Sequence, residues 1–125
     1  MKLDLAFREA NGYLLVQVEG EWTPEAVQQG IEEVAQVAEE RGHDRVLLDI
    51  RNMSGPKTDL HRFLAGEHAA KAWGHPLRLK VAAVYKEELI DKFTENVAVN
   101  RGANIIVLSD IDEAIEWLTR DPTTK

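Results

Sequence analysis

The 125-residue chain carries a formal net charge of −7 and contains no cysteine. Its length suits one domain, and its 44% hydrophobic and 30% charged residues are typical of a globular protein rather than a disordered one. The absence of cysteine excludes disulfides, thiolate catalysis and cysteine-ligated zinc. The acidic charge argues against binding to nucleic acid and leaves at most a peripheral contact with membranes.

The first segments predict an antiparallel hairpin. Residues 3–8 and 13–19 alternate between apolar and polar side chains, which is typical of half-buried strands. Between them, Asn11 and Gly12 favour a tight turn because both residues tolerate a positive φ. Nothing in this region resembles a signal peptide, so we expect a cytoplasmic protein.

Helices and strands alternate through the rest of the chain. Thr23 and Pro24 favour the start of a helix, and Gly42 favours its end. The second helix has an apolar stripe that contains Leu60 and Phe63, and a loop over residues 51–57 precedes it. The expected elements are helices from 23 to 42, 58 to 74, 87 to 100 and 111 to 119 and strands over 45–50, 77–85 and 105–108.

This order, β-β-α-β-α-β-α-β-α, predicts a single α/β domain over residues 1–120, followed by a polar tail over 121–125. Its five-stranded sheet should be mostly parallel, with an antiparallel hairpin at the N-terminus. The strands alternate instead of being continuously apolar, so we expect the helices mainly on one face of the sheet and a partly open second face. That open face is a candidate surface for a homodimer or a partner. Its apolar residues are Leu15, Leu47, Ala82 and Val84.

Four stretches resemble the SpoIIAA-like family, also called STAS/Sec14-type domains: residues 93–108, 113–118, Gly20–Thr23 and Val46–Arg51. The resemblance implies a sheet in sequential strand order and a role like that of anti-sigma-factor antagonists, which bind a partner kinase. It also implies lipid or ligand binding beneath a helix that moves, as in Sec14-type proteins.

The antagonists are switched by phosphorylation of a serine in an Asp-Ser-Ser-Gly motif that enters the second helix. The corresponding residues here are Lys57 to Leu60, and Thr58 falls near the phosphoacceptor position. The preceding aspartate and the following glycine of the motif are absent. We therefore predict that Thr58 is not a phosphorylation switch.

Ligands of open α/β sheets bind beyond the carboxyl ends of the strands. We expect a ligand or partner site at this edge, where the starts of two helices favour an anionic group. Simple capping of those helices is the favoured alternative for the residues at their starts. For Asp49, pairing with Arg51 is favoured over a role as base or ligand anchor. The candidate residues are Asp49, Arg51, Ser54, Thr58, Asp59, Tyr85 and Ser109.

No arrangement of residues predicts catalysis, a metal or a cofactor. His61, His68 and His75 recur every seven residues, which is about 10.5 Å along a helix and too far for two of them to hold one ion. Phosphate-binding loops and nucleophile-elbow motifs are absent from the sequence. Each tryptophan is interpreted as a packing residue at the edge of the core.

Two hypotheses for function follow. The first is a non-enzymatic regulatory or protein-interaction domain with an unidentified protein partner. The alternative is a carrier of a lipid or of a small apolar or anionic molecule, with a pocket between the second and third helices that opens when the second helix moves.

Overall fold

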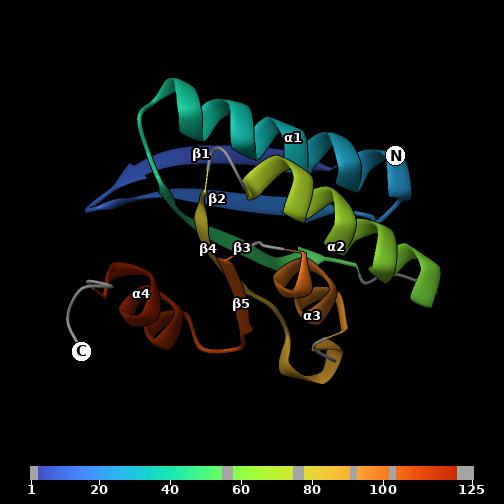
Figure 1. The fold of residues 1–125 in the computed structure, drawn as a ribbon. Helices are drawn as coiled ribbons and strands as arrows, with labels where there is room; N and C mark the ends of the chain where they lie inside the picture. The colour runs from blue at the N-terminus through green and yellow to red at the C-terminus, as the bar shows by residue number, and fades with distance from the viewer. Residues whose placement is uncertain (1–2, 55–57, 75–77, 91–92, 102–103, 121–125) are drawn as a thin grey trace.

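The computed structural model describes residues 3–54, 58–74, 78–90, 93–101 and 104–120. The predicted tail, residues 121–125, lies outside them. Five strands form one sheet in the order β1-β2-β3-β4-β5, in which only the β1–β2 pair is antiparallel (Figure 1). The predicted α/β class and mixed sheet are confirmed. The elements are β1 (Asp4–Ala10), β2 (Tyr13–Gly20), α1 (Pro24–Glu40), β3 (Arg45–Met53), α2 (Asp59–Trp73), β4 (Lys80–Val84), the 3-10 turn η1 (Glu87–Leu89), α3 (Phe93–Asn100), β5 (Asn104–Leu108) and α4 (Ile111–Thr119).

The ends of the first two strands and of α1 follow the local chemistry of the sequence. The hairpin pairs Ala10 with Tyr13 across a turn in which Gly12 has a φ of 91°. Thr23 caps α1 by accepting a hydrogen bond from the backbone N–H of Ala26 at 3.1 Å, and Pro24 occupies the first turn.

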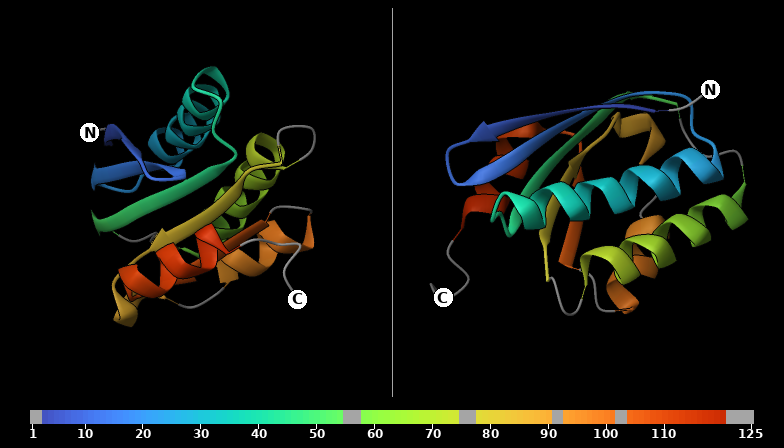
Figure 2. Two further views of the ribbon diagram at one scale, coloured as in Figure 1. Left: turned by 90° about the vertical axis from the view of Figure 1, so that its left-hand side faces the viewer. Right: turned by 90° about the horizontal axis from the view of Figure 1, so that it is seen from above.

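The main core lies between the sheet and the helices α1 and α2, which lie side by side on one face (Figure 2). Leu14, Val16 and Val46 of the sheet are fully buried there. Trp73 of α2 is also buried, and its indole Nε1 donates a hydrogen bond to the carbonyl of Ile31 in α1 at 2.9 Å. This bond joins the two helices within the apolar core. α3 packs beside α2 and contacts β5.

α4 lies on the second face of the sheet and packs over β3, β4 and β5, so this face is covered over those strands and partly open, as predicted, beside them. Ala114 and Leu118 of this amphipathic helix are fully buried. Beneath them Leu47, Ala82 and Val84 are also buried, and only Leu15 of the four predicted surface residues stays half-buried. Three of the four residues expected on the open part of this face are therefore buried instead, because they lie in the apolar strip beneath α4.

Other elements also differ from the prediction. β3 extends to Met53 because its ladder with β2 continues through the pairs Glu19–Asn52 and Gly20–Met53. The expected helix over residues 87–100 is instead the turn η1 followed by α3, with residues 91–92 outside the described part.

Arg78 precedes β4 with a φ of 57°, so the strand predicted over residues 77–85 begins only at Lys80 and ends at Val84. The backbone N–H of Arg78 donates to the carbonyl of Gly74 at 2.6 Å, which holds the chain against the end of α2. Lys80 lies on the second face, with Nζ 4.6 Å from the ring centre of Trp117. Burial, together with the nearby guanidinium groups of Arg45 and Arg120, lowers the pKa of Lys80.

Candidate functional site

Asp49 and Arg51 form a tight ion pair near the carboxyl end of β3. The guanidinium Nε and Nη2 of Arg51 donate to the two carboxylate oxygens of Asp49 at 2.9 and 2.8 Å. The backbone N–H of Arg51 donates to the same carboxylate at 3.2 Å. Both carboxylate oxygens are thus occupied, on a residue that is only 8% exposed. This geometry agrees with the structural role that the sequence favoured for Asp49, which is pairing with Arg51.

The hydrogen bonds from Arg51 lower the pKa of Asp49, although burial acts in the opposite direction. The carboxylate therefore stays ionised and compensated by the guanidinium. Such a group is a poor proton acceptor, because protonation would weaken the pair. A role of Asp49 as a general base finds no support in this geometry.

Ser54 and Thr58 lie on either side of residues 55–57, which are outside the described part. The Oγ of Ser54 accepts a hydrogen bond from the backbone N–H of Trp22 at 2.8 Å, which ties the end of β3 to the start of α1. The Oγ1 of Thr58 accepts from the backbone N–H of His61 at 3.1 Å and caps α2. Asp59 is the first residue of α2, and its side chain lies outside the described residues.

Tyr85 and Ser109 follow two neighbouring strands. The backbone N–H of Tyr85 donates to the carbonyl of Leu108 at 2.9 Å, and its side chain is buried. Ser109 is exposed and precedes Asp110, the cap of α4. Among the described residues, no hydrogen bond or ion pair joins the Asp49 carboxylate to Ser54, Thr58 or Ser109. The predicted residues share an edge of the sheet but do not form one cluster.

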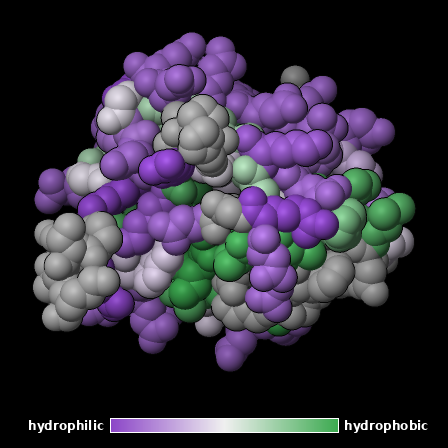
Figure 3. Space-filling model, viewed as in Figure 1, coloured by the Kyte–Doolittle hydropathy of each residue, from purple (hydrophilic) through white to green (hydrophobic). Residues whose placement is uncertain are grey.

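The start of α2 exposes an aliphatic side chain that the sequence predicted to be in the core. Leu60 is 63% exposed, in the turn that Thr58 caps. Hydrophobic side chains are visible in Figure 3 at the right-hand edge, where α2 begins. α2 contacts the core instead through Ala65, Ala69 and Trp73. Its apolar residues occur on several sides, so its periodicity did not identify the exposed one.

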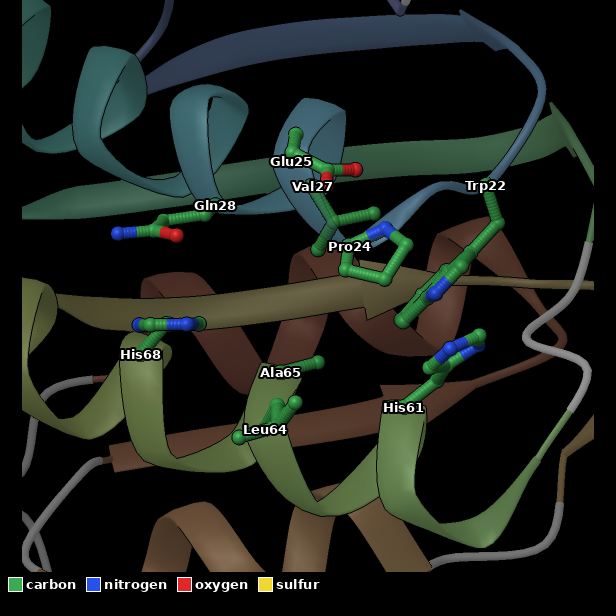
Figure 4. A pocket seen from close by; sticks show the side chains of 9 residues that line it. All are labelled: Trp22, Pro24, Glu25, Val27, Gln28, His61, Leu64, Ala65 and His68. Atoms are coloured by element: carbon green, nitrogen blue, oxygen red, sulfur yellow. The ribbon is translucent and has the colours of Figure 1, made fainter.

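A cleft between α1 and α2 was missed by the sequence analysis. Its volume is about 140 Å³, and it opens between the start of α1 and the first half of α2 (Figure 4). Trp22 and His61 lie together at one end of it, whereas His68 and Gln28 lie at the other. The lining residues are Trp22, Pro24, Glu25, Val27, Gln28, His61, Leu64, Ala65 and His68.

Two nitrogen atoms at this cleft have no hydrogen-bond partner among the residues that the structure describes. They are the indole Nε1 of Trp22 and the imidazole Nδ1 of His61, and both are buried. Most buried polar atoms in proteins are hydrogen-bonded, so a pair of exceptions on one cleft is unusual. Local sequence patterns could not reveal it, because the two residues come from different elements. In the described part of the chain, no group of three potential metal ligands occurs.

The topology and the helices on both faces define a protein with the SpoIIAA-like fold. An anti-sigma factor antagonist from Mycobacterium paratuberculosis superimposes with a TM-score of 0.64 and 9% identity, over 95% of this chain and 96% of that one. A DUF3478 family protein with a SpoIIAA-like fold, from Shewanella loihica, gives 0.59 and 21% identity over 94% and 93%. No protein-family model and no curated protein sequence matches the chain.

Proposed function

We propose that this chain is a non-enzymatic regulatory domain that binds a protein partner through the start of α2. The observation that carries the proposal is the exposure of Leu60, two residues after Thr58. This is the place where the family resemblance puts the switch region of anti-sigma-factor antagonists. The fold that the chain shares with such an antagonist supports the same role.

An exposed leucine alone carries little weight, because single apolar residues are common on protein surfaces. The position of Leu60 is more informative than its exposure alone. The Thr58 cap orders the backbone of the first turn of α2, and Leu60 is exposed to solvent in that turn. With the backbone of the turn already ordered, docking in a partner's pocket costs mainly the rotamer freedom of the leucine side chain, about 0.5–1 kcal/mol. The start of α2 is thus suited to anchor a partner.

Thr58 serves in this proposal as a helix cap and not as a phosphoacceptor. Its hydroxyl oxygen already accepts the N–H of His61, and the flanking residues depart from the family's phosphorylation motif. We expect intact-mass and peptide mass spectrometry of the chain from its own cells to show Thr58 unmodified. Stoichiometric phosphate on Thr58 would contradict this assignment.

The binding proposal is tested with Leu60→Asp and a matched control. Partners are captured from the source cells, purified and titrated against each variant by calorimetry. Loss of one buried aliphatic anchor and burial of a charge should weaken binding by tenfold or more, about 1.4 kcal/mol. Val99→Asp is the control, because Val99 is the other large aliphatic residue exposed in the described part of the chain, at 47%, and it lies on α3.

Leu60→Asp and Val99→Asp must have the same unfolding midpoint within error for the comparison to count. Equal affinity of Leu60→Asp and the wild-type chain would contradict docking through the start of α2. The same conclusion would follow if Val99→Asp alone lost binding.

A lipid carrier has less support. The cleft lies between α1 and α2 and not, as expected, between the second and third helices, and α2 and α3 pack against each other. Its volume of about 140 Å³ is below the roughly 300–1,000 Å³ of sites for drug-sized ligands. No helix among the described residues is long and apolar enough to span a bilayer. A cytoplasmic location and a homodimer through the sheet stay predictions.

A further inference from the structure

Two buried nitrogen atoms without a hydrogen-bond partner among the described residues, Trp22 Nε1 and His61 Nδ1, belong to residues that line the cleft between α1 and α2. A buried polar atom without a hydrogen bond destabilises the folded chain, because it has lost water and gained nothing in exchange. Aromatic rings turn readily about their terminal side-chain torsion. A modest rotation of either ring therefore presents its nitrogen to a molecule in the cleft.

The volume and the lining residues of the cleft limit the size of the molecule that it can bind. Apolar cavities of about 150 Å³ in proteins accommodate benzene, which is close to the volume found here. Val27 of α1 and Leu64 and Ala65 of α2 provide apolar contacts (Figure 4). One ring, or an aliphatic chain of similar bulk, fills this space.

The electrostatics of the cleft favour a negative charge on that molecule. The indole Nε1–H of Trp22 can only donate, and His61 donates from Nδ1 in one neutral tautomer and when protonated. The end of the cleft where Trp22 and His61 lie is beside the first turns of α1 and α2, whose N-termini carry partial positive charge. Glu25 opposes this, but its side chain is exposed to solvent.

We infer that the cleft binds a compact carboxylate with a ring-sized apolar body. Its carboxylate accepts hydrogen bonds from Trp22 Nε1 and His61 Nδ1, and its body packs between Val27 and Leu64. This function does not depend on the partner proposed for the start of α2. Nine or so non-hydrogen atoms give an expected dissociation constant in the millimolar range.

The three indole N–H signals of the chain provide the test. Trp73 Nε1 is bonded to Ile31, and Trp117 lies on the opposite face of the sheet, so both act as internal references. The probe is benzoate, titrated into the ¹⁵N-labelled chain, with Trp22→Phe used to assign the Trp22 signal. We expect a saturable downfield shift of the Trp22 indole signal and unchanged signals from the other two.

Two comparisons test whether the carboxylate of the probe and the imidazole of His61 contribute to binding. Benzyl alcohol has the same ring without the charge and should bind about tenfold more weakly or worse. His61→Phe keeps the backbone N–H that Thr58 accepts and should weaken benzoate binding to a similar degree, whereas His43→Gln, outside the cleft, should not. The inference is overturned if benzoate gives no saturable shift of the Trp22 signal, if benzyl alcohol binds equally well, or if His61→Phe binds benzoate as the wild-type chain does.

Discussion

At the scale of single residues, the Asp49 carboxylate has a structural role, because Arg51 occupies it with hydrogen bonds. Three hydrogen bonds from Arg51 hold it at distances of 2.8 to 3.2 Å. The side chain of Arg51 is 44% exposed, so water screens part of the attraction. The pair stabilises the end of β3 and leaves no free base there.

This arrangement predicts how stability depends on pH. Because the pKa of Asp49 is lowered in the folded chain, the pair contributes fully above the ordinary aspartate pKa of about 3.9. The contribution is lost as pH falls through the lowered value. Asp49→Asn should therefore reduce the free energy of unfolding at neutral pH by about 1 kcal/mol and make its acid dependence shallower.

Urea unfolding at a series of pH values from neutral to acid measures both effects. Arg51→Gln removes the other partner and should make the acid dependence shallower in the same way. If Asp49→Asn kept the acid slope of the wild-type chain, the lowered pKa would be the wrong explanation for the acid sensitivity of this pair.

At the scale of elements, α4 decides what the second face of the sheet can do. Asp110 caps it by accepting the backbone N–H groups of Asp112 and Glu113 at 2.8 and 3.2 Å. The helix has only nine residues, so its cap and its buried face supply most of its stability. Without α4, the apolar strip that contains Leu47 and Val84 would face solvent.

We expect Asp110→Ala to lower the free energy of unfolding by about 1 kcal/mol, because two N–H groups lose their acceptor. Asp110→Asn keeps a side-chain oxygen and should retain most of the stability. Thermal unfolding followed by circular dichroism distinguishes the two variants. Equal loss in both would show that the charge of Asp110 matters more than its capping oxygen.

At the scale of the whole molecule, the order of elements and the mixed sheet were predictable because they depend on local patterns. Alternation along residues 3–8, the turn at Gly12 and the caps Thr23 and Asp110 each act within a few residues. The position of α4 was not predictable, since an amphipathic helix does not reveal which face of a sheet it covers.

The candidate site was predictable only in part. Asp49 and Arg51 are two positions apart on one strand, and their pairing was expected from that spacing. The cleft depends on Trp22 and His61, which only the packing of α1 against α2 brings together. Leu60 was expected in the apolar stripe of α2 that faces the core. Because α2 has apolar residues on several sides, only the packed structure shows which of them are buried.

The measurement that tests the central claim most directly is hydrogen–deuterium exchange of the chain with and without its purified partner. If the partner docks at the start of α2, exchange should slow in a peptide over residues 58–66 and stay unchanged in β1, β2 and α4. Protection confined to β1 and β2 or to α4, with residues 58–66 unaffected, would contradict the proposed interface.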